Sequence, residues 1–342
     1  MATRVLIADD SSLMRRLIGD FLTGEGFVVN AAKDGREAVE LARAQRPDVA
    51  ILDVRMPVMD GISALRELVS MGVPTIMFSS LTAEDSKVTM EALEIGAFDF
   101  MLKPGGMVTL SIDEVKSDLL RKVRAAAISK HIILPRTAVR FKPAKRKSGK
   151  PATAAIVVAS STGGPSMVKA LVESLRSEID AAVLIVQHMP PVFTKSFAER
   201  LSETSKIPVK EAEDGETIEE GTAYLAPGDY HMEVTNTPIP RVSLNQGPKV
   251  NFVRPAADPL FISASRRFGK RTIAVVLSGM GSDGAKGALA VKSSGGYVIA
   301  QDEQTSIVYG MPKAVVDCGA ADEVLPIGKM GQRVMDLVLK LF

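Results

Sequence analysis

Short apolar runs alternate with amphipathic stretches over roughly the first 130 residues, and this alternation predicts the fold. The apolar runs cover residues 4–10, 27–32, 49–55, 74–80 and 99–104. Segments between them, such as 12–22 and 35–44, carry apolar residues at helical spacing. Strands that alternate with helices favour a parallel sheet covered on both faces. Five such units predict an α/β domain with a five-stranded sheet in flavodoxin-like order.

The same alternation resumes at residue 154 and continues to the end of the chain. The expected strands are residues 154–160, 181–189, 222–227, 272–280 and 296–301, with helices that include 165–176 and 282–294. This half therefore predicts a second α/β domain, doubly wound around a mostly parallel sheet.

A basic stretch separates the two patterns. Residues 136–150 contain seven Lys or Arg and no acidic residue, together with a Pro, a Gly and a Ser. Like-charge blocks of this kind are typically solvated, so we expect an exposed linker; a basic docking patch is the alternative. The expected domains are residues 1–125 and 152–342, joined by a linker at 126–151.

Composition and charge narrow the class of protein. The 342 residues are 46% hydrophobic and 24% charged, with a net charge of +2, which is ordinary for a soluble globular protein and gives no electrostatic reason to expect nucleic acid. Cys318 is the single cysteine, which fits a reducing cytoplasm. The chain shows neither a secretory leader nor an apolar run long enough to span a membrane, so we expect a cytoplasmic protein without membrane insertion.

Acidic residues end two strands of the first predicted sheet. Asp9 and Asp10 follow the first strand, Asp53 follows the third, and Lys103 follows the fifth. Strand C-termini meet at one edge of a parallel sheet, so three carboxylates and an ammonium should converge there. Oxygen ligands of this kind suit Mg²⁺. Asp53 can then attack phosphorus, and Ser79 at the end of the fourth strand can donate to the new phosphoryl oxygens. Alternatively, these are merely polar loop residues.

Three residues at strand ends of the second domain suggest an activated serine. Ser161 follows the strand 154–160 and opens the turn STGGP, His188 ends the next strand, and Asp283 follows the strand 272–280. If these strands are neighbours, the hydroxyl, the imidazole and the carboxylate meet in the order of a catalytic triad. Taken singly, Ser161 and Asp283 also suit helix N-caps and His188 suits a structural histidine.

Other interpretations of these glycine-rich turns are weaker. STGG lacks the G-x-G-x-x-G spacing of a dinucleotide site. The turn GMGSDG is better suited as a donor loop, in which the backbone N–H of Met280 faces an oxyanion.

The first domain resembles the receiver domain of response regulators, through the ordered set DD, DVRMPVMDG, SS and KP. The resemblance covers nearly all of residues 1–125. It implies phosphorylation at Asp53, metal binding by Asp9, Asp10, Asp53 and the Arg55 carbonyl, and phosphate sensing by Ser79 and Lys103. It also implies a histidine kinase as the phosphodonor.

The second domain resembles the CheB family of chemotaxis methylesterases. The motifs are ASSTGGP, VQHMPPVFTKSFAERL, YLAPGDYHMEV, NFVRPAADPLF, LSGMGSDGAKG and YGMPKAV, within residues 152–340. The resemblance implies Ser161 as nucleophile, His188 as base and Asp283 as its orienting partner, with Met280 and Thr162 on the oxyanion side. Ser160 departs from the family's usual Ala or Gly. His231 is a second candidate base that we interpret as shaping the pocket, and His131 is expected to face solvent.

The resemblance also implies an activity and a setting. The expected activity is hydrolysis of glutamate methyl esters on methyl-accepting chemotaxis receptors, with release of methanol, and deamidation of glutamines. No cofactor is expected for this step. Phosphorylation of Asp53 is expected to relieve autoinhibition of the hydrolase, which would be recruited to receptor arrays at the inner membrane.

Two rival functions share the receiver domain. A DNA-binding response regulator needs a basic output domain, and no surplus of positive charge is present here. A non-catalytic binding output would not need Ser161, His188 and Asp283 together.

Overall fold

A computed structural model describes residues 2–104, 112–129 and 149–341. The chain divides into two compact units, Met1–Ile133 and Leu134–Phe342, and each is considered by itself. His131 and most of the predicted linker lie outside the described residues. The linker and its boundaries therefore stay predictions.

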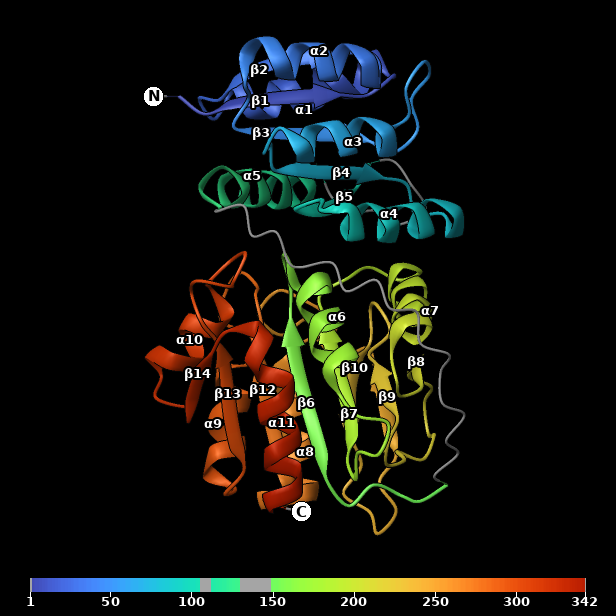
Figure 1. Cartoon of the computed structure of the whole chain (residues 1–342), viewed down its shortest axis with the longest axis vertical. Helices are drawn as coiled ribbons and strands as arrows, with labels where there is room; N and C mark the ends of the chain where they lie inside the picture. Colours follow the sequence, from blue (N-terminus) through green and yellow to red (C-terminus); the bar gives the residue numbers. More distant parts are fainter. Residues whose placement is uncertain (1, 105–111, 130–148, 342) are drawn as a thin grey trace. The chain divides into compact units, whose positions relative to one another are not determined.

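The N-terminal unit is a five-stranded parallel sheet with helices on both faces, as predicted. The strands are β1 (Arg4–Ala8), β2 (Val28–Ala32), β3 (Val49–Asp53), β4 (Thr75–Ser79) and β5 (Asp99–Leu102), in the order β2-β1-β3-β4-β5. The helices are α1 (Ser12–Thr23), α2 (Gly35–Gln45), α3 (Gly61–Ser70), α4 (Ala83–Ile95) and α5 (Ile112–Ile128). Helices α2, α3 and α4 follow one another along one face of the sheet (Figure 1).

Local sequence fixes where three of these helices begin. Asp34, Asp60 and Thr82 are N-cap residues whose side chains accept hydrogen bonds from backbone N–H groups three residues later. Such caps satisfy donors that the first helical turn leaves open. Strands β3 and β4 are buried along their whole length, which is expected for central strands covered on both faces.

The C-terminal unit contains a seven-stranded sheet in which every neighbouring pair is parallel, which confirms the predicted fold class. Its strands are β6 (Ala155–Ser160), β7 (Ala182–Gln187), β8 (Val209–Glu211), β9 (Ala223–Leu225), β12 (Thr272–Val276), β13 (Tyr297–Gln301) and β14 (Glu323–Leu325). Their order is β14-β13-β12-β6-β7-β9-β8.

An antiparallel ribbon accompanies this sheet, formed by β10 (His231–Val234) and β11 (Val242–Asn245). His231 is the first residue of β10.

Helices cover both faces of the seven-stranded sheet (Figure 1). One face carries α6 (Gly164–Ser174), α7 (Phe193–Thr204) and α11 (Ile327–Leu341). The other carries α8 (Ala257–Phe268), α9 (Ala285–Ser293) and α10 (Met311–Asp317), and the short 3-10 helix Gly269–Arg271 follows α8. A buried core lies between the sheet and α8 and α9, with Phe261 and Leu260 fully enclosed. This packing brings the N-termini of α8 and α9 together.

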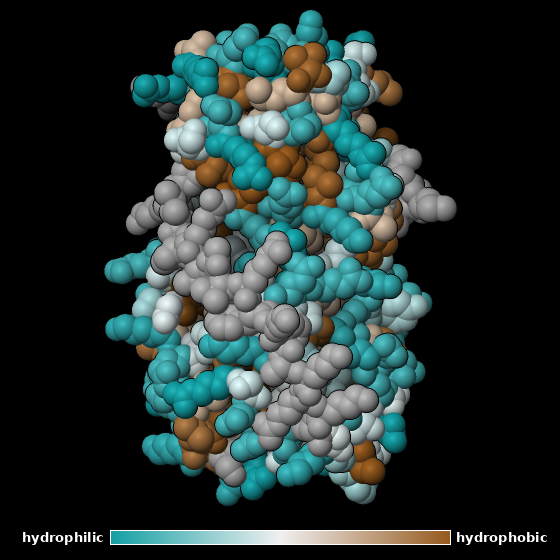
Figure 2. All heavy atoms as spheres, turned by 45° about the vertical axis from the view of Figure 1, so that its right-hand side comes forward, coloured by the Kyte–Doolittle hydropathy of each residue, from teal (hydrophilic) through white to brown (hydrophobic). Residues whose placement is uncertain are grey.

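Hydrophilic side chains cover most of the coloured surface in Figure 2, and hydrophobic side chains gather in smaller groups. Exposed large hydrophobic residues include Leu13, Val58, Phe252 and Leu339. Among the described residues, no helix combines the length and the apolar character needed to cross a bilayer.

Candidate active site

The strand order satisfies the condition on which the serine prediction depended. Strand β6 lies between β12 and β7, so the residues that follow these three strands share one edge of the sheet. Ser160 pairs in register with Gln187, and the His188 N–H donates to the Ser160 carbonyl at 3.0 Å. Ser161 and His188 are therefore neighbours just beyond the paired strands. Asp283 reaches the same edge from the loop after β12.

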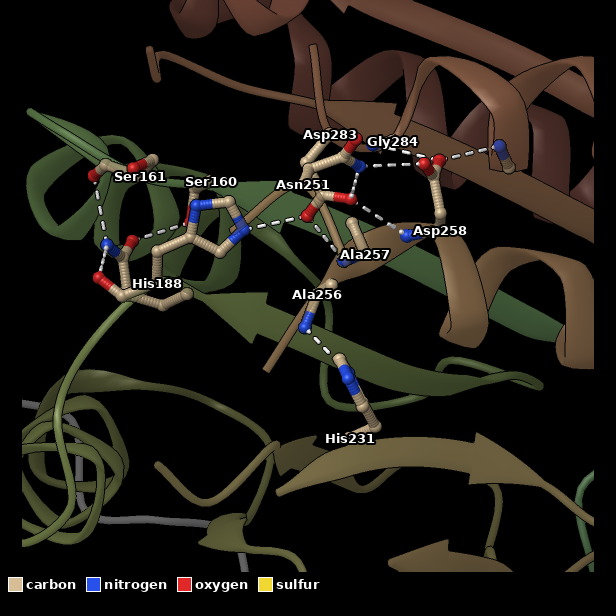
Figure 3. Close-up of polar contacts among 12 residues, drawn as sticks. Ser160, Ser161, His188, His231, Asn251, Ala256, Ala257, Asp258, Asp283 and Gly284 are labelled. Carbon is tan, nitrogen blue, oxygen red and sulfur yellow. Dashed lines mark hydrogen bonds and ion pairs between the residues drawn. The ribbon is translucent and has the colours of Figure 1, made fainter. Parts of the chain in front are cut away.

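His188 and Asp283 are in direct contact. The distance from His188 Nε2 to Asp283 Oδ2 is 2.7 Å, and both side chains are almost completely buried. Figure 3 shows the imidazole between the serine turn and the Asp283 carboxylate. An ionised carboxylate only accepts hydrogen bonds, so Nε2 carries the proton and Nδ1 keeps its lone pair in the neutral ring. The structure thus leaves Nδ1 as the basic nitrogen.

The two adjacent serines have different surroundings. Ser160 is fully buried and donates from Oγ to Gln187 Oε1 at 2.6 Å, while the Gln187 amide donates to the Ser161 carbonyl at 2.9 Å. The Ser161 hydroxyl makes no hydrogen bond within the described part of the chain, including to His188. In unliganded enzymes, catalytic hydrogen bonds are often long or poorly aligned. Of the two hydroxyls, only the one at Ser160 is held by a hydrogen bond within the described residues.

Glycines allow the chain to turn sharply after Ser161. Gly163 has φ +70°, a left-handed conformation in which side chains are strained. A Cβ on Gly164 would lie 2.4 Å from Gln187 Oε1 and 2.8 Å from the Ser160 Cβ. The STGG sequence therefore lets helix α6 start directly against β6 and β7, with Ser161 at the bend.

Asp283 has a hydrogen-bond donor on every side. Its Oδ2 also accepts from the Ala257 N–H at 2.6 Å, and its Oδ1 accepts from Asn251 Nδ2 at 2.9 Å and from the Asp258 N–H at 3.2 Å. Burial alone would raise the pKa of Asp283, but its bonds to His188, Ala257 and Asn251 hold that pKa below the ordinary value. The carboxylate stays ionised and oriented toward His188.

Neither Ser161 nor Asp283 caps the helix that follows it in the chain. Helix α6 has Gly163 at its N-cap without a side-chain cap, so Ser161 does not cap it. Helix α9 has Gly284 at its N-cap, also without a side-chain bond, and Asp283 instead caps the neighbouring α8. The Asp283 carboxylate therefore both caps α8 and contacts His188.

His231 holds backbone rather than facing Ser161. Its Nε2 lies 3.0 Å from the Pro248 carbonyl, and its Nδ1 accepts from the Ala256 N–H at 3.2 Å (Figure 3). His231 is thus tied to the backbone at Pro248 and Ala256, and its role in shaping the pocket stays a prediction.

Two backbone N–H groups near Ser161 are open. Within the described residues, neither Thr162 nor Met280 donates a backbone hydrogen bond. Met280 follows Gly279, where an added Cβ would lie only 2.8 Å from the Ser161 Cβ. Both residues therefore have backbone N–H groups that are unpaired among the described residues and close to Ser161 in the chain or in space.

The N-terminal unit gathers the predicted acidic residues. Carboxylate oxygens of Asp9, Asp10 and Asp53 lie within 4.8 Å of one another, and Lys103 Nζ is 2.8 Å from both Asp9 Oδ2 and Asp53 Oδ2. Burial raises the pKa of Asp53 above the ordinary value, although Lys103 opposes this. Burial alone would lower the pKa of Lys103, but the adjacent carboxylates of Asp53 and Asp9 raise it.

The acidic cluster fits a hard cation. Asp9 Oδ2 is buried, and its contact with Lys103 is close but lacks hydrogen-bond geometry, so a lone pair remains available. Asp10 is exposed, which leaves room for water ligands. A few carboxylates with open positions are the arrangement that Mg²⁺ accepts.

Two further receiver residues are anchored to helix α4. Ser79 is buried, and its Oγ accepts from Thr89 Oγ1 at 2.9 Å. Arg55 donates from Nε to Asp85 Oδ1 at 2.6 Å, and its N–H donates to Asp53 Oδ1 at 3.3 Å.

Comparison with known proteins identifies both units. The family model for the CheB methylesterase matches residues 156–334. The chain belongs to the CheB methylesterase family. A second family model, the response regulator receiver domain, matches residues 5–112. A DNA-binding output, one of the rival interpretations, has no support in these matches.

Relatives of this family align along nearly the whole chain. Proteins named protein-glutamate methylesterase/protein-glutamine glutaminase are 46% identical in Pyrococcus horikoshii, over 98% of this chain and 93% of the relative, and 44% identical in Thermotoga maritima, over 98% of each. The crystal structure of the Thermotoga maritima CheB methylesterase catalytic domain is 45% identical, covers 54% of this chain and 98% of its own, and has a TM-score of 0.53.

Three residues of the site were not singled out from the sequence. Asn251 and Asp258 lie in the CheB-like motif NFVRPAADPLF, and Gln187 directly precedes His188. A signal existed for Asp258, since an acidic residue after PAA suits the first turn of a helix. Nothing local links Asn251 to Asp283, 32 positions away.

Proposed function

We propose that this chain hydrolyses methyl esters of glutamate side chains on proteins, with Ser161 as nucleophile, His188 as base and Asp283 as the orienting acid. The observation that carries the proposal is the 2.7 Å contact between His188 Nε2 and Asp283 Oδ2 beside the open Ser161 hydroxyl. This is the geometry that activates a serine, because the base is held in one tautomer next to the nucleophile.

The first half of the reaction acylates the serine. Ser161 Oγ forms a bond to the ester carbonyl carbon, and its proton moves to His188 Nδ1. The carbonyl oxygen becomes an oxyanion, toward which the N–H groups of Thr162 and Met280 donate. Each such donor contributes roughly 3–4 kcal/mol to the barrier reduction in serine hydrolases. The oxyanion then collapses, the bond to methoxide breaks, and His188 returns the proton so that methanol leaves.

The second half releases the product. Water gives a proton to His188 Nδ1 and attacks the acyl carbon, the bond to Ser161 Oγ breaks, and the serine recovers its proton. Glutamate is left as a free carboxylate. A glutamine amide offers the same electrophile and would leave as ammonia, which agrees with the double name of the relatives. Neither half needs a cofactor.

The receiver unit is proposed to accept a phosphoryl group at Asp53 from a histidine kinase. Mg²⁺ would be held by Asp9, Asp10, Asp53 and the Arg55 carbonyl, and it would supply positive charge to neutralise the phosphoryl oxygens. Lys103 is already beside Asp53 and offsets the remaining charge. Ser79 would exchange its contact with Thr89 for one with a phosphoryl oxygen.

Phosphorylation is proposed to relieve inhibition of the hydrolase by the receiver, through residues 126–151 as linker. The substrates are proposed to be methyl-accepting chemotaxis receptors, which would bring a cytoplasmic enzyme to receptor arrays at the inner membrane. Residues 150–342 alone should then exceed the unphosphorylated full chain in activity. Equal rates would remove the proposal of inhibition while leaving the hydrolase intact.

Methanol release from methyl-labelled receptor membranes tests the activity itself. The full chain should release labelled methanol, faster with a small phosphodonor, and Ser161→Ala should abolish release. Ser160→Ala is the matched control, because it removes the neighbouring hydroxyl and leaves the nucleophile. Turnover by Ser161→Ala at the normal rate would refute the assignment.

A further inference from the structure

Two buried carboxylates face each other beside His188, and only one of them has a role in the proposed reaction. Asp283 and Asp258 are 2% and 3% exposed. Like charges buried side by side repel strongly unless donors lie between and around them. The donors that surround this pair are therefore essential to its geometry.

The backbone supplies most of these donors through reciprocal capping of α8 and α9. Asp283, which precedes α9, accepts from the N–H groups of Ala257 and Asp258 at the start of α8. Asp258 Oδ1 in return accepts from the N–H groups of Gly284 and Gly287 at the start of α9, at 3.0 and 2.8 Å. Each helix N-terminus thus binds the carboxylate of the other.

Asn251 closes the gap between the two carboxylates. Its Nδ2 donates to Asp258 Oδ2 at 3.0 Å and to Asp283 Oδ1 at 2.9 Å, so both of its N–H bonds are used (Figure 3). Among the described residues, no other side chain donates to both acids.

The turn that carries Asn251 is itself fixed. Val250 and Val253 exchange two backbone hydrogen bonds of 3.2 and 3.0 Å around it. Asn251 has φ +52°, a left-handed conformation that asparagine tolerates better than most residues. The backbone thus presents the amide in one position, directly at the acid pair.

We propose that Asn251 is a positioning residue for the hydrolase: its amide bridges Asp258 and Asp283 and thereby keeps the Asp283 carboxylate aligned on His188 Nε2. This rests on the proposed function. Without the amide, Asp283 Oδ1 keeps only its long bond to the Asp258 N–H and faces the Asp258 carboxylate directly. The carboxylate then turns, and His188 loses the tautomer and orientation that leave Nδ1 available to Ser161. Among the described residues, Asn251 hydrogen-bonds to neither Ser161 nor His188, so substrate binding should be unaffected.

The test compares Asn251→Gly with the wild-type full chain. Glycine accepts φ +52° and removes the whole side chain with its amide, so the turn is preserved. On methyl-labelled receptor membranes with a phosphodonor, we expect kcat to fall about 10- to 100-fold, the size found for groups that orient metal-binding side chains from behind. We expect KM to stay within about twofold, a split that a loosened fold would not produce.

Asn245→Ala is the matched control. Asn245 also donates its amide to a carboxylate, Glu233 Oε1 at 2.8 Å, on the β10–β11 ribbon of the same unit. It should leave kcat unchanged. Should Asn251→Gly not fold, Asn251→Asp serves instead, because it keeps the shape and the turn preference, replaces the donor by a third carboxylate, and should lower kcat further still.

The outcomes separate this inference from the proposed function. If the wild-type chain releases no methanol, both the proposed function and the positioning role of Asn251 are wrong. A wild-type chain that releases methanol, with Asn251→Gly at the same kcat or with its loss confined to KM, overturns the positioning role alone. A selective fall in kcat with an unaffected Asn245→Ala supports it.

Discussion

Each unit has a buried carboxylate at the carboxyl edge of its sheet, but the two carboxylates differ in their hydrogen-bond partners and in the direction of their pKa shifts. Asp53 and Asp283 both lie at the carboxyl edge of a parallel sheet, and both are buried. Asp283 accepts hydrogen bonds from His188, Ala257, Asn251 and Asp258, and its pKa is lowered. Asp53 has a long bond from the Arg55 N–H and one contact with Lys103, and burial raises its pKa.

This difference shows that burial alone does not set the direction in which the pKa of a carboxylate shifts. A carboxylate surrounded by donors is fixed in orientation, which suits a residue that must only hold a histidine. A carboxylate crowded by other acids and short of donors remains destabilised until a cation arrives, which suits a residue that must bind metal and react. Asp283 already has its hydrogen-bond donors within the fold, whereas Asp53 and its neighbouring acids have carboxylate oxygens that could bind a metal ion.

Replacement of Asp283 should give the largest effect, a loss of activity. Asp283→Asn keeps the shape but offers His188 an amide, which favours the wrong tautomer and should lower kcat by roughly 10⁴-fold. Methanol release measures this, with Asp322→Asn as a control on an acid whose side chain contacts Lys292 and the Val298 N–H. A loss of less than tenfold would mean that Asp283 is mainly a cap of α8.

Addition of Mg²⁺ should give the next largest effect, and only at the Asp9, Asp10 and Asp53 cluster. At ten times its dissociation constant, Mg²⁺ should stabilise the receiver by about 1.4 kcal/mol. Thermal unfolding of the full chain followed with and without Mg²⁺ measures this, and Asp9→Asn should remove it. An unchanged unfolding temperature for the receiver transition would count against the metal site.

Removing the crowded charge should stabilise the receiver. Asp53→Asn relieves a carboxylate whose raised pKa marks its ionised form as unfavourable in the fold, so we expect a gain of roughly 1 kcal/mol in the free energy of unfolding. Denaturant titration measures it. Destabilisation would show that the Lys103 ion pair outweighs the crowding.

The smallest effect is the pH dependence of that gain. The folded pKa of Asp53 lies above its unfolded value, so the folded state binds the proton more tightly. The penalty for ionised Asp53 is complete above the folded pKa and disappears below the unfolded pKa, about 4. The difference in stability between Asp53→Asn and wild type should therefore shrink as the pH is lowered toward 4. A constant difference would assign it to packing rather than charge.

Much of both sites could be predicted from sequence because parallel sheets impose a rule. Any residue that directly follows a strand reaches the carboxyl edge, so Asp9, Asp53 and Lys103 converge whatever the loops do. The same rule brought Ser161 and His188 together, once β6 and β7 proved to be neighbours. The roles of these residues remain proposals.

The rest depends on tertiary packing that no local pattern reveals. Asn251 meets Asp283 only because α8 packs on α9 and brings their N-termini together. Strands β8 and β14 are three residues long, too short for an alternation of polar and apolar positions to appear. The separation of Ser160 from Ser161 rests on the side chain of Gln187, which binds one hydroxyl and leaves the other open.

The most direct test of the serine assignment is covalent labelling with a serine-directed fluorophosphonate, with the modified residue located by fragmentation mass spectrometry. The account predicts a single adduct on Ser161 in the wild-type chain, formed far more slowly in Asp283→Asn. An adduct on Ser160, or an equal labelling rate in Asp283→Asn, would contradict it.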